Sequence, residues 1–218
     1  MTAGAVVLMK YSLCMSLFSM TVTFAHDLVQ PDWRGDEGST HQVWSFDDDD
    51  NPALPETDNN PYGTAEATIT VGDFGEGWLD TVPFGSQTGI WDMGREGTIV
   101  LDIPNRPEAL PYKEIWLQVT YYDSPTYPPV VTIPGASLIS EQTLLVEEDS
   151  PGDWLLDQSV WRMEPNPSSE QIILTADWYG STIDQIVVDT ICIPEPGTAI
   201  ILAVGTMAAI MRRRRLPG

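Results

Sequence analysis

The sequence predicts an all-β protein built on a single antiparallel β-sandwich, because short strand patterns and turns alternate through its central region. Runs of alternating polar and apolar residues recur about every ten residues, and turns rich in proline or glycine separate them. Outside these runs, no segment of the central region shows ten residues of helical periodicity. Nine or so strands with this spacing favour two packed antiparallel sheets.

The expected strands follow one another from residue 42. The first, 42–46, precedes an acidic, proline-rich loop at 47–63. Later strands are expected at 66–71, 90–91, 97–103, 113–122, 130–133, 137–147, 153–163, 170–178 and 182–190. Because side chains alternate along a strand, 113–122 should turn four apolar residues to the core: Ile115, Leu117, Val119 and Tyr121.

The charge of the chain limits its partners. Residues 26–193 hold 31 of the 32 acidic residues and five of the ten basic ones, which gives them a net charge of −26. A field of that sign repels nucleic acid and anionic lipid, so we exclude both as partners of this region. It is compatible with divalent cations and with neutral or basic polysaccharide. The region has the usual length of one domain.

The first 25 residues have the pattern of a secretory signal peptide. They contain one basic residue, Lys10, and no acidic residue, and an apolar run leads to Ala25. Cleavage is expected between Ala25 and His26 by a signal peptidase, after passage through the export translocon. A lipoprotein signal ending at Cys14 does not fit, because Leu13 occupies a position that requires a small residue.

The C-terminal end combines three short features in a fixed order. An uncharged stretch at 197–211 would form a helix about 22 Å long, which is short against a hydrocarbon core of ~30 Å. A cluster of arginines behind it should stay on the cytoplasmic side and set its orientation: Arg212, Arg213, Arg214 and Arg215. A rigid tripeptide precedes it: Pro194, Glu195 and Pro196.

This order of parts resembles the PEP-CTERM sorting signal, which a membrane protease-transpeptidase called an exosortase recognises in bacteria that make exopolysaccharide. The resemblance implies that the exosortase is a partner and that residues 194–196 are the recognised motif. It also implies a body that is first membrane-anchored outside the cytoplasm and then surface-bound or extracellular. The alternative is a permanent single-pass anchor that carries Pro-Glu-Pro by accident.

The expected organisation has four parts. A signal peptide (1–25) is followed by a polar leader with the first strand and the acidic loop (26–65). The main part of the sandwich (66–191, with 42–46) leads into the sorting signal (192–218). We expect the leader to add an edge strand. Because Cys14 leaves with the signal peptide, Cys192 has no partner for an internal disulfide.

The last strand carries a second resemblance. Its run from Ile183 to Thr190 is similar to the final strand of jelly-roll domains of the carbohydrate-binding type, which pairs in mid-sheet with an Asp near its start. The resemblance implies a jelly-roll-like sandwich, and an immunoglobulin-like sandwich is the alternative. Alternation alone places Ile186 and Val188 on one face.

The acidic loop is a candidate calcium site, because calcium takes six to eight oxygen ligands. The candidate ligands are Asp47, Asp49, Asn51 and Asp58. An EF-hand is excluded, because Pro52 stands where glycine is needed and no helices flank the loop. A calcium site in a sandwich loop and a solvated acidic loop both remain open, and no other cofactor is expected.

Aromatic side chains are the other candidates for ligand binding, because sugar rings stack on exposed aromatic faces. The conceivable members of such a platform are Trp78, Trp154, Trp161, Trp178, Tyr179, Tyr121 and Tyr122. The alternative is that they fill the core. Trp116 is expected opposite the main apolar face of its strand.

Catalysis finds little support in the sequence. Residues 26–193 hold two histidines, His26 and His41, and no nucleophile elbow, zinc-type cluster or phosphate-binding glycine loop. We therefore expect a non-enzymatic, exosortase-sorted surface or matrix protein associated with exopolysaccharide. A carbohydrate-binding module is the alternative, and a glycoside hydrolase or lyase is the weaker one.

Overall fold

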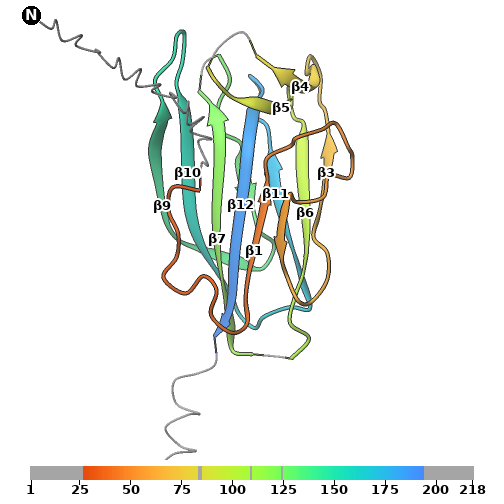
Figure 1. Cartoon of the computed structure of the whole chain (residues 1–218), viewed down its shortest axis with the longest axis vertical. Helices are drawn as coiled ribbons and strands as arrows, with labels where there is room; N and C mark the ends of the chain where they lie inside the picture. The colour runs from red at the N-terminus through yellow and green to blue at the C-terminus, as the bar shows by residue number, and fades with distance from the viewer. Residues whose placement is uncertain (1–26, 83–84, 109, 124, 194–218) are drawn as a thin grey trace, which may run out of the picture.

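The computed structural model describes residues 27–193 apart from 83–84, 109 and 124, and this part of the chain is all-β. The twelve strands of these described residues form two antiparallel sheets that pack face to face (Figure 1). The expected β-sandwich is therefore confirmed. The expected signal helix and the helix at 197–211 lie outside the described residues. Within the described residues, no helix is long and apolar enough to cross a membrane.

The larger sheet, sheet A, has the order β2-β1-β12-β7-β10-β9, and β5 and β4 continue from the start of β12. Its strands are β1 (Ser39–Trp44), β2 (Thr57–Asn59), β4 (Gly77–Thr81), β5 (Thr88–Asp92), β7 (Tyr112–Tyr122), β9 (Ala136–Glu147), β10 (Trp154–Met163) and β12 (Thr182–Ile193). The smaller sheet, sheet B, has the order β3-β6-β11-β8. Its strands are β3 (Glu66–Thr70), β6 (Thr98–Pro104), β8 (Val130–Thr132) and β11 (Ser169–Thr175).

The core lies between the two sheets and follows from the alternation of each strand. In β7 the four expected side chains, Ile115, Leu117, Val119 and Tyr121, are all buried. In β12, Ile186 and Val188 face the same core, and the strand lies in mid-sheet between β1 and β7. Sheet B contributes alternate residues of β6 and β11, such as Leu101 and Ile172. Burial of these apolar side chains supplies the main stabilising term.

The leader does not add an edge strand. Residues 27–38 instead cross the outer face of sheet A, where Trp33 packs edge-on against Trp116 with ring centroids 6.4 Å apart. Trp116 can meet it because alternation turns this residue away from the core, as expected. Strands β2 and β4 were not predicted from sequence, because runs as short as Thr57–Asn59 carry no readable period.

Candidate functional site

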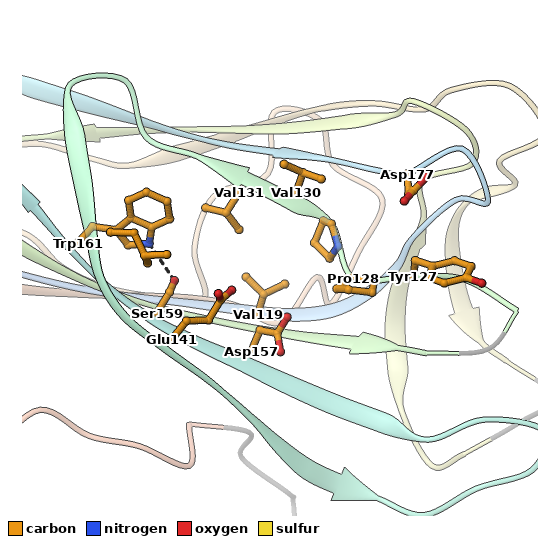
Figure 2. Close-up of a pocket in the computed structure, with 12 residues that line it drawn as sticks. Val119, Tyr127, Pro128, Val130, Val131, Glu141, Asp157, Ser159, Trp161 and Asp177 are labelled. Atoms are coloured by element: carbon orange, nitrogen blue, oxygen red, sulfur yellow. Dashed lines mark hydrogen bonds between the residues drawn. The ribbon is translucent and has the colours of Figure 1, made fainter.

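An open cleft lies at the edge of the sandwich where sheet A extends past sheet B. Sheet B ends at the three-residue strand β8, whereas sheet A continues through the long hairpin of β9 and β10. The inner face of that hairpin is therefore left partly uncovered. The resulting cleft has a volume of about 410 Å³ (Figure 2). A volume of this size is within the range of ligand-binding clefts.

Three carboxylates line the cleft and come from separate parts of the fold. Glu141 lies on β9, Asp157 on β10 and Asp177 after the end of β11. No lysine, arginine or histidine is among the lining residues. The cleft is therefore an acidic site that can accept hydrogen bonds and attract positive charge.

Asp157 is the carboxylate most affected by its surroundings. Burial raises the pKa of Asp157, although hydrogen bonds with Thr143 and Tyr121 act in the opposite direction. The Tyr121 hydroxyl lies 3.4 Å from Asp157 Oδ1, and burial followed by the charge of Asp157 raises the pKa of this tyrosine. Tyr121 therefore stays protonated and can only donate to Asp157 at neutral pH.

The apolar walls of the cleft include two aromatic rings. Trp161 lies on β10, and its Nε1 donates a hydrogen bond to the Ser159 hydroxyl at 2.9 Å, which fixes the ring (Figure 2). At the other end of the cleft, Tyr127 packs against Tyr179 with ring centroids 5.2 Å apart. Carboxylates beside aromatic faces form the combination that recognises sugars, because rings stack and hydroxyls donate.

The aromatic surface continues outward from Tyr127 as an exposed group that we call the aromatic patch: Phe74, Arg95, Tyr127, Trp178 and Tyr179. Phe74, Trp178 and Tyr179 are 85%, 56% and 67% exposed. The Arg95 guanidinium lies 3.5 Å from the ring centre of Trp178 and 5.3 Å from that of Phe74. These cation–π contacts hold the rings in place.

The structure divides the sequence-predicted aromatic candidates into two groups. Trp154, Tyr121 and Tyr122 are buried and belong to the core. Trp78 is partly buried against the core and donates to the Phe46 carbonyl at 2.8 Å. The remaining candidates lie at the cleft or in the patch: Trp161, Trp178 and Tyr179.

The members that sequence reasoning missed are Phe74, Tyr127 and the three cleft carboxylates. Tyr127 lies between Pro125 and Pro128, and this proline-rich segment has no strand pattern that would indicate where the tyrosine points. The carboxylates are indistinguishable in sequence from the other acids of the chain. Their common location depends on pairing between strands that are distant in sequence.

The described structure does not bring the candidate calcium ligands of the acidic loop together as a metal site. Asn51 bonds the backbone of β3, donating to the Ile69 carbonyl at 2.7 Å and accepting from the Ile69 N–H at 3.0 Å. Asp58 lies on β2 and accepts from the Ala65 N–H at 3.4 Å. Asp47 and Asp49 are exposed. In the described part of the chain, no three His, Cys, Asp or Glu side chains lie together as a metal would require.

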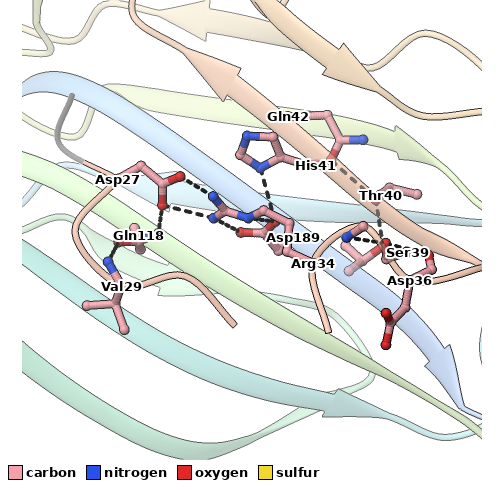
Figure 3. A network of polar contacts seen from close by, with 12 residues as sticks. Asp27, Val29, Arg34, Asp36, Ser39, Thr40, His41, Gln42, Gln118 and Asp189 are labelled. Atoms are coloured by element: carbon pink, nitrogen blue, oxygen red, sulfur yellow. Dashed lines mark hydrogen bonds and ion pairs between the residues drawn. The ribbon is translucent and has the colours of Figure 1, made fainter. Parts of the chain in front are cut away.

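A second polar cluster fastens the leader to sheet A (Figure 3). Arg34 donates to Asp189 Oδ1 and Oδ2, both at 2.6 Å, and also pairs with Asp27. His41 Nδ1 lies 3.0 Å from Asp189 Oδ1, and Gln118 donates to Asp27 at 2.8 Å. Because the charged side chains of this cluster pair with one another, we assign it a structural role.

The residues of the sorting signal and of the signal-peptide cleavage site lie outside the described residues: Pro194, Glu195, Pro196, Arg212, Arg213, Arg214, Arg215, Ala25 and His26. The described chain reaches Ile193, immediately before the first of the motif residues. In comparisons with known proteins, no family model and no curated protein sequence matches the chain.

Proposed function

We propose that this is an exported surface or matrix protein of the PEP-CTERM type, a substrate of an exosortase and not itself an enzyme. A jelly-roll-like sandwich forms its body, between a signal helix and a short transmembrane helix. The observation that carries the proposal is that β12 runs to Ile193, so the motif at 194–196 follows the folded body with no linker. A body with a net charge of −26 is also expected to stay soluble after export.

Each part of the sorting signal has its own task in this proposal. The helix at 197–211 holds the chain in the membrane after export, and the arginines at 212–215 keep its end in the cytoplasm. The exosortase then recognises Pro194, Glu195 and Pro196 beside the membrane. Removal of the helix releases the body to the surface or the matrix.

The test is to express the full chain in cells with and without the exosortase and to identify its C-terminal peptide by mass spectrometry. We expect the C-terminal arginines to be lost only when the enzyme is present. A matched variant, Glu195→Ala, should keep them in both strains. A chain that still ends in Arg215 or beyond in the exosortase-producing strain would contradict the proposal.

A second function is favoured by the cleft and the aromatic patch, namely binding of the exopolysaccharide with which the protein is displayed. Tyr179 lies just before β12, and Pro194 follows the other end of this twelve-residue strand. At ~3.3 Å per residue, about 36 Å separates the two ends. The patch therefore lies on the end of the body away from the anchor, where polymer is accessible.

Polysaccharide pull-down with the full-length protein in detergent tests this second function. Trp161→Ala and Trp178→Ala should each weaken retention several-fold, because each removes one stacking surface. Tyr62→Ala is the matched control, since the Tyr62 hydroxyl lies near Gly38, and the neighbouring Ser39 pairs with Ile191 at the anchor end of β12. Equal retention of all three variants would contradict sugar binding at this site.

A further inference from the structure

Lys113 is the only lysine among the described residues, and it is completely buried. Lysine is almost never fully buried unless it is paired, because its ammonium is strongly hydrated. Here the side chain starts from β7 in sheet A and ends between the sheets. Its Nζ contacts both Asn105 Oδ1 and Glu170 Oε1.

Asn105 and Glu170 complete a closed triangle with this lysine. Asn105 follows β6 and Glu170 lies on β11, so both belong to sheet B. Asn105 Nδ2 donates to Glu170 Oε2, while Glu170 Oε1 receives the lysine amine. All three side chains are buried, with exposed fractions of 5% or less. An amine, a carboxamide and a carboxyl group are thus in mutual contact away from water.

Burial disfavours the ionised forms of both the lysine and the glutamate. Burial lowers the pKa of Lys113, against the raising effect of the charge and hydrogen bond of Glu170. Burial also raises the pKa of Glu170, against the lowering effect of Lys113 and Asn105. Transfer of one proton from the ammonium to the carboxylate relieves both costs. The result is a neutral amine, which is the nucleophilic form of lysine, beside a carboxylic acid.

We propose that Lys113 and Asn105 are joined by an intramolecular amide bond, formed by the protein itself with Glu170 as the proton carrier. The neutral Nζ of Lys113 attacks Cγ of Asn105, and the Glu170 acid donates a hydrogen bond that polarises the carboxamide. Glu170 then passes its proton to Nδ2 and, as the carboxylate, takes the surplus proton from Nζ. The Cγ–Nδ2 bond breaks, ammonia leaves, and Glu170 ends as the carboxylic acid.

The reaction needs no oxidant and no co-reactant, because one amine and one carboxamide give one amide and one ammonia. Proximity is the main source of its rate, because the fold holds the reacting groups together and excludes water. The bond links the start of β7 to the end of β6. It therefore ties sheet A to sheet B and closes a loop between residues eight positions apart.

The proposed bond lies at the end of the domain where a C-terminal attachment, such as the membrane helix before its removal under the proposed function, would pull. Lys113 pairs across the backbone with Cys192, one residue before β12 ends at Ile193. Tension on a C-terminal attachment would enter the domain at this end of β12. A covalent tie between the sheets at that end would resist separation of β12 and β7 from sheet B.

Trypsin digestion of the full-length protein tests the proposal directly. Trypsin does not cut after a lysine whose amine is acylated, so the digest should contain an uncut peptide of residues 96–162. That peptide should be lighter than its sequence by one ammonia, about 17 Da. The readout does not involve either terminus, so it is independent of whether sorting occurs. Peptides 96–113 and 114–162 of unmodified mass from the wild-type protein would overturn the proposal.

Three variants separate the proposed bond from an ordinary buried ion pair. Glu170→Gln should abolish or slow the reaction at least tenfold while keeping a similar shape, and Asn105→Ala should abolish it. Asn105→Asp keeps an acyl carbon but loses water instead of ammonia, so its linked peptide should have the same mass as that of the wild type. A peptide from Asn105→Ala that also resists cutting and is lighter would overturn the assignment of Asn105.

Discussion

Arg34 and Asp189 form a bidentate ion pair on the outer face of sheet A, with both N···O distances at 2.6 Å. Asp189 is a fully buried residue of the central strand β12, and Arg34 belongs to the leader 155 positions earlier. The planar guanidinium matches the carboxylate geometry, so the pair fixes direction as well as distance. Together with the packing of Trp33 on Trp116, this contact attaches the polar leader to the fold.

Loss of Arg34 should destabilise the protein well beyond an ordinary surface substitution. In Arg34→Ala the buried Asp189 carboxylate keeps only His41 as a partner, which leaves a charge poorly compensated. We expect a loss of about 2–3 kcal/mol in the free energy of unfolding, measured by urea denaturation. Glu37→Ala removes an exposed charge from the same leader and should change the free energy by less than about 0.5 kcal/mol. Equal effects of the two changes would contradict a structural role for the ion pair.

The leader should also give stability a defined dependence on pH through Asp27. Burial would raise the pKa of Asp27, but hydrogen bonds from Arg34 and Gln118 and the charge of Arg34 lower it below its ordinary value of 3.8. A carboxyl group with a lowered pKa stabilises the fold above the unfolded pKa, and this contribution disappears as the pH falls through the folded pKa.

Melting temperatures of the wild type and of Asp27→Asn should therefore differ near neutral pH and converge below about pH 4. The wild type should be the more stable protein at neutral pH, because only the ionised carboxylate pairs with Arg34. A difference that stays constant over the whole range would show that the hydrogen bonds, and not the charge, make the contribution.

Calcium should not stabilise the protein more than other salts do. Specific binding would add about 2.7 kcal/mol at a hundredfold excess over the dissociation constant. Asn51 and Asp58 instead hydrogen-bond the backbone of Ile69 and Ala65, which follow the acidic loop. We expect calcium, magnesium and sodium at matched ionic strength to raise the melting temperature equally, by screening the acidic surface. A rise found with calcium alone would contradict this expectation.

Leu117 offers a direct measure of the core between the sheets. It is fully buried on β7, so Leu117→Ala should cost about 2–5 kcal/mol through lost burial and the cavity that remains. Leu54→Ala is the matched control, because this leucine is 60% exposed and should change stability by less than about 0.5 kcal/mol. Urea denaturation of both variants gives the comparison.

Much of the sandwich could be predicted from sequence, because residue alternation and turn residues within each segment indicate its strands. Alternation in β7 and β12 identified their buried faces, and turn residues marked most strand ends to within a few positions. The extension of β12 to Ile193 was missed, because its last residues show no turn that would distinguish strand from membrane-proximal linker. The short strands β2 and β4 were missed because three to five residues carry too little pattern.

The candidate sites could not be predicted in the same way, because they depend on pairing between distant segments. The cleft forms only because sheet A extends past the short strand β8, and it brings together Glu141, Asp157 and Asp177. The contacts between Lys113, Asn105 and Glu170 likewise require β7 of one sheet to face β6 and β11 of the other. The sequence by itself determined the longer strands, the charge and the two terminal signal patterns, which are local properties. The tertiary structure alone decided which polar side chains meet, because sheet pairing and sheet packing bring them together from positions that no local pattern connects.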